Sequence, residues 1–297
     1  MKETKKLEFK SDITNTFLKT VSAFANYEGG QIRFGVADDG KVIGLKNPVQ
    51  SCLDIENKIN DTIRPQPQYE LVVQESDKTV ILTVEAGRNK PYTYKSKAYR
   101  RNDTATIEVD ELELTRLILQ GKNINYEELP ADNQELSFKI LEKRAKQEIG
   151  IKSLNKDVLK TLNLYSDSDG YKQAAALLAD ENEFPGIDIA RFGESISIIL
   201  KRVTFEHESV LEELEKAVRI YRDYYQYEEI QGIERKKVEK IPEEAFRETI
   251  ANALIHRTWD VNAQIRVMMF DDRIEISSPG GLPTGISEEE YLKGNVS

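Results

Sequence analysis

The sequence has little of the material that several kinds of site require. Its 297 residues include one cysteine, Cys52, and two histidines, His207 and His256. One cysteine cannot form an internal disulfide or a cysteine-based zinc site, and two histidines leave little for a histidine metal cluster. The N-terminus MKETKKLEFK lacks an apolar signal region, and no apolar run approaches the length of a membrane span. We therefore expect a cytoplasmic protein without a membrane partner.

The sequence also lacks the glycine patterns of two common nucleotide-binding folds. The pattern G-x-x-x-x-G-K-[ST] occurs nowhere, which excludes a P-loop motor. Gly29, Gly30 and Gly35 do not form G-x-G-x-x-G either. A helicase-type motor is therefore not expected.

The chain as a whole has no excess of positive charge, and its formal net charge is −10. The distribution is uneven: residues 1–121 hold 18 Lys and Arg against 18 Asp and Glu, which leaves 24 basic and 34 acidic residues in the remainder. The first part is neutral and the rest carries the whole negative charge. Any nucleic-acid contact is therefore expected from the first part.

The length predicts two or three domains, and the order of elements predicts an α/β (α+β) fold. We expect a mixed-sheet domain at residues 1–121, a polar linker at 122–136, and a helical connector followed by an α+β domain within 137–297. Gly121 stands where a helix C-cap glycine belongs. The chain stops without a clear end to the fold, so we expect the last domain to be truncated.

Apolar periodicity and turn residues give the expected elements. In the first domain, helices are expected at 12–27, 51–63 and 110–119, and strands at 31–36, 41–44, 69–74, 79–85, 92–95 and 97–101. In the remainder, helices are expected at 138–148, 155–162, 171–179, 210–224 and 243–256, and strands at 186–189, 195–200, 264–270 and 274–277.

Acidic side chains flank the first expected strands. Glu3 and Glu8 lie upstream, and Asp38-Asp39-Gly40 forms a turn between residues 31–36 and 41–44. Carboxylates from separate elements can hold Mg²⁺ or Mn²⁺ and orient water for phosphodiester cleavage, with Lys10 neutralising phosphate. The alternative is a plain hairpin turn beside a frayed terminus.

A second cluster combines cations with tyrosines between residues 86 and 102, where no acidic residue occurs. Cations neutralise phosphates and tyrosine faces stack on bases, which favours contact with nucleic acid. The alternative is an edge hairpin protected by lysines. The candidate binding residues are Arg88, Lys90, Tyr92, Tyr94, Lys95, Lys97, Tyr99, Arg100 and Arg101.

A third cluster lies on the last expected helix. Glu248, Asn252 and His256 are spaced by four and share one face. Such a polar stripe suits ATP binding, with Asn252 on Mg²⁺ and Glu248 orienting water, or it is simply a solvated face.

The first domain resembles the Schlafen-type AlbA family. The resemblance rests on LEFK at 7–10, AFANYEGG at 23–30, FGVADDG at 34–40 and VIG at 42–44. It implies nucleic-acid binding and transcriptional regulation in bacteria. Some relatives are ribonucleases with two glutamates five apart and a downstream aspartate. Glu3 and Glu8 match the glutamate spacing, but Ala37 stands at a position where the family often has an acid, so either Asp38 substitutes for the aspartate or the site is lost.

The C-terminal part resembles RecG-related regulators with a degenerate GHKL-type ATPase fold. The resemblance rests on the helix at 244–257 followed by DDRIEISSPGGLP at 271–283. It assigns Glu248, Asn252 and His256, with the loop glycines Gly280 and Gly281, to nucleotide binding in the full-length protein. Ser278-Pro279 stands where the family has an aspartate.

We therefore predict a nucleic-acid-binding transcriptional regulator with a degenerate ATP-binding region. One alternative is a metal-dependent endonuclease using Glu3, Glu8 and Asp38. Another is a non-catalytic assembly protein, a homo-oligomer held by a tyrosine cluster. The tyrosines of that cluster are Tyr221, Tyr224, Tyr225 and Tyr227.

Overall fold

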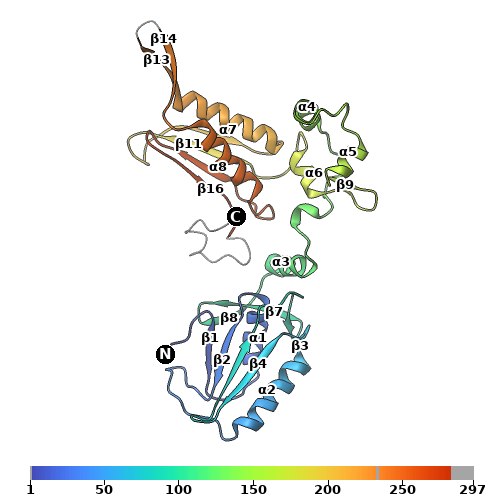
Figure 1. The fold of residues 1–297 in the computed structure, drawn as a ribbon, viewed down its shortest axis with the longest axis vertical. Helices are drawn as coiled ribbons and strands as arrows, with labels where there is room; N and C mark the ends of the chain where they lie inside the picture. The colour runs from blue at the N-terminus through green and yellow to red at the C-terminus, as the bar shows by residue number, and fades with distance from the viewer. Residues whose placement is uncertain (1, 232–233, 282–297) are drawn as a thin grey trace. The chain divides into compact units, whose positions relative to one another are not determined.

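The fold is described from a computed structural model, which covers residues 2–231 and 234–281. The chain divides into two compact units, Met1–Asn125 and Tyr126–Ser297 (Figure 1). Both combine helices with sheets, which confirms the predicted α+β fold class. In the described residues, no helix is both long and apolar enough to cross a membrane.

The first unit contains a four-stranded mixed sheet with the order β1-β2-β5-β4. Its central strands are rich in Ile, Val, Leu and Phe, which suit a buried pleated surface. β1 runs parallel to β2, whereas β2–β5 and β5–β4 are antiparallel. The strands are β1 Leu7–Lys10, β2 Gly30–Phe34, β4 Tyr69–Gln74 and β5 Thr79–Val84.

A second sheet in this unit is fully antiparallel, with the order β3-β6-β7-β8. The central pair β6–β7 is the ribbon expected around residues 92–101. The strands are β3 Ile63–Arg64, β6 Thr93–Tyr94, β7 Lys97–Asn102 and β8 Ala105–Glu108.

Helix α1 (Phe17–Asn26) contacts strands of both sheets, and every residue in it except Lys19 is buried. The two glycines after it permit this packing. Gly29 has φ +73°, and a Cβ on Gly30 would lie 2.6 Å from the Phe24 ring. The Gly-Gly pair therefore lets β2 start directly against the helix that precedes it.

Two capped helices complete the first unit. α2 (Pro48–Thr62) begins after Asn47, whose side chain accepts a hydrogen bond from the Gln50 amide at 3.2 Å. α3 (Glu111–Lys122) begins after Asp110 and ends at Asn123, which is left-handed at φ 54°. Gly121 is therefore not the C-cap: it lies within α3, where a Cβ would collide with the Lys90 carbonyl.

The second unit is built on a mixed sheet with the order β12-β11-β15-β16. β11 and β15 are parallel, and the outer pairs are antiparallel. The strands are β11 Ile187–Phe192, β12 Ile199–Phe205, β15 Ile265–Met269 and β16 Ile274–Ser277. Alternate residues of β11 and β15 are buried in a core shared with helices α7 (Val210–Tyr225) and α8 (Glu243–Ile255).

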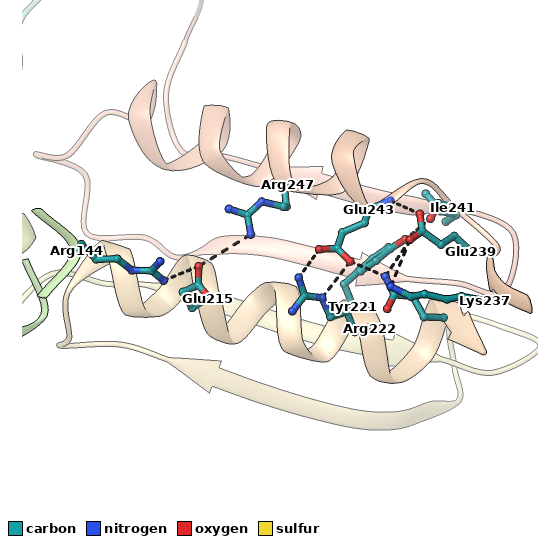
Figure 2. A network of polar contacts seen from close by, with 10 residues as sticks. Arg144, Glu215, Tyr221, Arg222, Lys237, Glu239, Ile241, Glu243 and Arg247 are labelled. Carbon is teal, nitrogen blue, oxygen red and sulfur yellow. Dashed lines mark hydrogen bonds and ion pairs between the residues drawn. The ribbon is translucent and has the colours of Figure 1, made fainter. Parts of the chain in front are cut away.

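Polar contacts hold α7 and α8 together (Figure 2). Arg222 on α7 pairs with Glu243 at the start of α8, and these hydrogen bonds lower the pKa of Glu243 to about 2. Glu215 on α7 accepts from Arg144 and lies 4.0 Å from Arg247 on α8. The two helices therefore pack through a mainly apolar seam that ion pairs border.

A small helical part precedes this sheet, with a core of Leu141, Leu159, Leu164 and Ala175. Pro130 forms an isolated β-bridge with Lys172. The residues that follow Tyr126 therefore pack with the second unit, which begins at that residue. Its elements are η1 Tyr126–Glu128, α4 Lys139–Glu148, α5 Lys156–Thr161, β9 Tyr165–Ser166, β10 Gly170–Tyr171 and α6 Gln173–Leu178.

The structure corrects two expected strands and adds a hairpin that the sequence did not predict. Residues 41–44 form no strand, because only Val36 and Val42 bridge there. The strand expected at 195–200 is β12, displaced toward residue 205. A charged antiparallel hairpin, β13 Gln226–Gln231 and β14 Glu234–Glu239, was not expected at all.

The tyrosine cluster predicted as an oligomer contact is also corrected. Tyr221 and Tyr225 are buried, stacked on each other at 5.5 Å, and Tyr221 stacks on Phe246 at 4.8 Å. Tyr224 is half-buried under Arg191. Only Tyr227 of the four is exposed. Three of these rings belong to the unit's own packing because α7 turns them onto the sheet and α8.

The second unit buries one carboxyl group without full hydrogen bonding. Glu213 on α7 is 2% exposed, and its Oε2 has no hydrogen-bond partner in the described structure. Burial raises the pKa of Glu213 from 4.5 to about 8, and the nearby Glu208 adds to the effect. Folded protein therefore holds a proton at neutral pH that unfolded protein releases.

We predict that Glu213 makes the second unit less stable as the pH rises from about 4.5 to about 8. The contribution is fully present below the unfolded pKa and is lost as the pH passes the folded pKa. Glu213→Gln removes this pH dependence. At pH 8.5 the free energy of unfolding of the variant is therefore higher than that of the wild type by more than about 1 kcal/mol. Urea unfolding at pH 5 and 8.5, followed by the fluorescence of the buried Trp259, measures the difference.

Glu244→Gln, an exposed change at the start of α8, is the control for removing one charge. Equal wild-type and Glu213→Gln stabilities at both pH values would contradict the prediction.

Candidate nucleic-acid interface

The last residue of α1 fixes the position of the basic ribbon. Asn26 is fully buried; its Oδ1 accepts from the Tyr92 amide at 2.7 Å, and its Nδ2 donates to the Tyr92 carbonyl at 2.9 Å. The Ser22 hydroxyl donates to the same carbonyl at 2.7 Å. The carboxamide thus pairs with the backbone as a neighbouring strand would, and it holds the start of β6 on α1.

The ribbon tyrosines are core residues. Tyr92, Tyr94 and Tyr99 are 4%, 5% and 6% exposed and belong to the hydrophobic core around α1. This placement corrects the expectation that their faces stack on bases, because those faces already pack against protein. Tyr94 and Tyr99 nevertheless line a surface groove with the small part of each side chain that is exposed.

This groove lies between the start of α1 and the β6–β7 turn. Lys95 and Ser96 have φ of 51° and 62°, so the turn is left-handed at both residues and presents Lys95 to solvent. The Lys19 ammonium lies 5.6 Å from the Tyr99 ring centre, and that of Lys95 lies 5.5 Å from the Tyr94 ring centre. The groove is lined by Asn15, Thr16, Lys19, Tyr94, Lys95, Lys97, Tyr99, Thr106 and Glu108.

The groove carries a net positive charge that the protein does not neutralise. Within the described residues, Lys19 and Lys95 form no ion pair with a carboxylate. Lys97 pairs with Glu108 at 2.7 Å, but both side chains are about half exposed. Such surface pairs contribute little, so an incoming phosphate can compete for Lys97.

The other predicted cations lie outside this groove. Lys90 is half-buried and donates to Gln120 at 3.2 Å, and burial lowers its pKa. Arg100 lies 3.2 Å from Glu113, and Arg101 is buried against Glu8. Arg88 is exposed. The structure thus brings Lys95 and Lys97 together with Tyr94 and Tyr99, and the remaining predicted cations do not line this groove.

The predicted acidic metal site does not form. Glu8 is 6% exposed, and its carboxylate accepts from both Lys10 and the buried Arg101. Glu3 accepts from the Phe9 amide at 2.8 Å, and Asp38 lies in the turn after Val36. In the described part of the chain, no three His, Cys, Asp or Glu side chains are grouped to hold a metal ion. Glu8 therefore joins β1 to β7 as a structural ion pair, which corrects the expected role.

The predicted nucleotide-binding residues run from the middle of α8 at Glu248 to its C-cap His256, with the loop glycines following β16. Glu248, Asn252 and His256 are exposed, and Asn252 donates to Glu248 at 3.1 Å. The loop after β16 is tied back to this end: the Thr258 amide donates to the Pro279 carbonyl at 2.9 Å.

A Cβ on Gly280 would lie 2.6 Å from the Thr258 hydroxyl oxygen, whereas a Cβ on Gly281 would meet nothing within 4 Å. ATP binding by these residues, and Mg²⁺ on Asn252, stay predictions.

Two residues of the candidate interface are not among the site residues predicted from the sequence. Lys19 lies within the helix expected at 12–27, and no local pattern places it opposite residues 94–99. Asn26 was read as part of a helix end, although a buried Asn before Gly-Gly is the signal that could have indicated a backbone clamp.

Comparison with protein families identifies the first unit. Residues 3–110 match the family model described as Schlafen, AlbA_2. These residues form a Schlafen AlbA_2 domain. Residues 262–297 match the model described as Putative ATP-dependent DNA helicase recG C-terminal, which covers β15 and β16. Both matches confirm the resemblances drawn from the sequence.

Among solved structures, the chain is similar to the DIP2311 protein from Corynebacterium diphtheriae, with a TM-score of 0.51 and 20% identity. The match covers 97% of this chain and 63% of that one, and it supports the fold.

The N-terminal domain of a Putative ATP-dependent DNA Helicase RecG-related Protein from Nitrosomonas europaea matches 36% of this chain and 79% of that one, at 21% identity and a TM-score of 0.25. No curated protein matches the chain.

We predict that Asn26→Ala destabilises the Schlafen AlbA_2 domain by about 1–3 kcal/mol, because it leaves the buried amide of Tyr92 unpaired and removes one of the two donors to the Tyr92 carbonyl. Amide hydrogen exchange of residues 92–101 measures the loss locally. The exposed Asn57→Ala on α2 is the matched control. Unchanged exchange in Asn26→Ala would contradict the clamp.

Proposed function

We propose that this protein binds nucleic acid through the groove of its Schlafen AlbA_2 domain. The observation that carries the proposal is the cluster of Lys19, Lys95 and Lys97 around Tyr94 and Tyr99 in one groove. Lysines spaced along a groove neutralise successive phosphates, and counterion release then provides most of the affinity. The neutral charge of residues 1–121 favours this domain over the acidic remainder.

Burial of the tyrosine faces limits how the groove can contact nucleic acid. Rings packed on α1 cannot intercalate between bases, so binding rests on phosphate and sugar contacts and has little sequence preference. Regulation of transcription, the finer role expected from the sequence, requires that the groove accept double-stranded DNA.

The nuclease alternative receives no support from the site geometry. Glu8 is committed to Arg101 and Lys10, and the three predicted carboxylates are not grouped. The residues present do not fit a shared metal ion, and we derive no cleavage step from them.

We predict that the triple variant Lys19→Gln, Lys95→Gln, Lys97→Gln binds nucleic acid roughly tenfold or more weakly than the wild type at low salt. Its slope of log affinity against log salt falls by about two units or more, since each phosphate contact contributes about 0.7–0.9. Fluorescence anisotropy with labelled single-stranded DNA, single-stranded RNA and duplex DNA, from about 50 to about 200 mM salt, measures both effects.

The matched control removes three other exposed lysines of the same domain, Lys2→Gln, Lys41→Gln and Lys46→Gln, which do not line the groove. It has the same net charge as the triple variant. Equal losses in both variants would show that only net charge matters, and absence of wild-type binding at low salt would reject the function. Duplex binding is the outcome that transcriptional regulation requires.

A further inference from the structure

A second hollow of the Schlafen AlbA_2 domain lies where the end of α1, the start of α3 and β7 meet. Its volume is about 130 Å³, and it shares no lining residue with the groove. Pockets for drug-sized ligands have volumes of roughly 300–1,000 Å³, so this hollow suits a small anion and not a nucleoside. Its charged lining residues are Lys5, Lys6, Glu28, Arg100, Arg101 and Glu113.

Cations outnumber carboxylates around the hollow. Four cations and two carboxylates line it. Glu8 lies outside the lining and pairs with Arg101, and Lys10 shares this carboxylate. The charge of Asp110, at the start of α3, reaches Tyr27 in the hollow. With Glu8, Lys10 and Asp110 included, five cations face four carboxylates, so the surroundings stay positive.

The two lysines of the hollow already hold an anion. Lys5 and Lys6 pair with different oxygens of Glu28, at 2.7 and 3.1 Å, and all three side chains are about half exposed. Hydrogen bonds from Lys5 and Lys6 lower the pKa of Glu28, so the anionic form is favoured here. Exposed ion pairs of this kind contribute little to stability. A more highly charged anion can therefore displace Glu28 from the lysines.

The two arginines of the hollow keep unused hydrogen-bond donors. Arg100 lies 3.2 Å from Glu113, which also accepts from the Tyr27 hydroxyl at 2.6 Å. Arg101 is buried and donates to Glu8 through a terminal nitrogen. In the part of the chain that the structure describes, the Nε of each arginine is buried without a hydrogen-bond partner. Arg100 is 43% exposed, so its guanidinium can exchange Glu113 for phosphate oxygens.

The hollow adjoins the groove. Thr106 lines the groove, and its hydroxyl accepts from the Arg101 guanidinium at 2.9 Å. On α1, Lys19 in the groove and Ala23 in the hollow are four residues apart and share one face. Four residues correspond to about 6 Å along the helix axis, which a few nucleotides span. A strand in the groove can therefore place its end in the hollow.

We propose that the hollow binds the terminal phosphate of a nucleic-acid strand whose adjoining nucleotides lie in the groove. A phosphate monoester carries a charge of about −1.5 to −2 near pH 7, whereas a phosphate within the strand carries about −1. The positive surroundings therefore favour the strand end, and the small volume excludes a base. The inference rests on the proposed function, because the groove holds the rest of the strand.

Fluorescence anisotropy with short single-stranded oligonucleotides tests the proposal. The probes carry a phosphate or a hydroxyl at the 5′ end or at the 3′ end, with the label at the opposite end. For one of the two ends, the wild type binds the phosphorylated form roughly tenfold more tightly at equal ionic strength, because charge-assisted hydrogen bonds are added. The hollow variant Lys5→Gln, Lys6→Gln, Arg100→Gln loses this preference. Arg101 is left unchanged because its ion pair is structural.

Two other triple variants are the controls. The variant of the three groove lysines binds both forms of the oligonucleotide more weakly but keeps the preference for phosphate. The variant Lys2→Gln, Lys41→Gln, Lys46→Gln has the same net charge as the hollow variant and lines neither site, so it also keeps the preference. Amide hydrogen exchange of residues 92–101 checks that each variant keeps the fold of the domain.

The outcomes separate this inference from the proposed function. Equal wild-type binding of phosphorylated and hydroxyl-ended strands would overturn the terminal-phosphate site and leave nucleic-acid binding in place. A preference that persists in the hollow variant would also overturn it. A site for free phosphate alone would let inorganic phosphate compete equally with both strand forms, which contradicts the proposal. Absence of binding for every oligonucleotide would reject the proposed function as well.

Discussion

The position of the candidate interface depends on one buried side chain, Asn26. Its carboxamide accepts from the amide of Tyr92, which would otherwise be buried without a partner just before β6, and it donates to the Tyr92 carbonyl together with Ser22. The Tyr92 backbone cannot leave α1 without exposing or orphaning these groups. The short strand β6 has only two residues, so the clamp rather than the ladder sets where the β6–β7 turn lies. Lys95 and Lys97 are carried by that turn, and Lys19 faces them from α1 itself.

A second buried interaction fixes the other end of the same domain. Glu8 on β1 and Arg101 on β7 form an ion pair that is almost fully buried, and Lys10 completes the carboxylate's partners. Removing one member of such a pair leaves an uncompensated charge and costs about 3–5 kcal/mol. A Glu8→Ala variant would therefore lose function through destabilisation of the domain, even if Glu8 had no role in catalysis. The glutamate spacing that suggested a nuclease has a sufficient structural explanation here.

The sequence predicted those elements that have a strong apolar pattern. Helices α1, α2, α7 and α8 and strands β4, β5 and β15 follow from periodicity, and their ends differ from expectation by a few residues. Apolar periodicity did not predict the shorter or more polar elements. β3 and β6 have two residues each, and the charged hairpin of β13 and β14 has no apolar alternation to reveal it. Asn123 rather than Gly121 ends α3, because the Lys90 backbone packs against the glycine.

The candidate site was only partly predictable, and the reason is physical. Cations and tyrosines between residues 86 and 102 were visible in the sequence, but which of them face solvent depends on long-range partners. Glu8 removes Arg101 from the surface across 93 positions of the chain, and α1 covers the tyrosine faces. Lys19 joins the groove only through the packing of α1 on β7. Sequence patterns indicate the candidate segment and cannot indicate which of its side chains reach the surface.

The central claim is that nucleic acid lies in the groove that Asn26 positions. Hydrogen–deuterium exchange of the whole chain, with and without the tightest-binding of the three oligonucleotides, tests this claim most directly. The account predicts added protection at residues 15–19 and 93–99. Protection confined to other surfaces of the domain, or to residues 126–281, would contradict it.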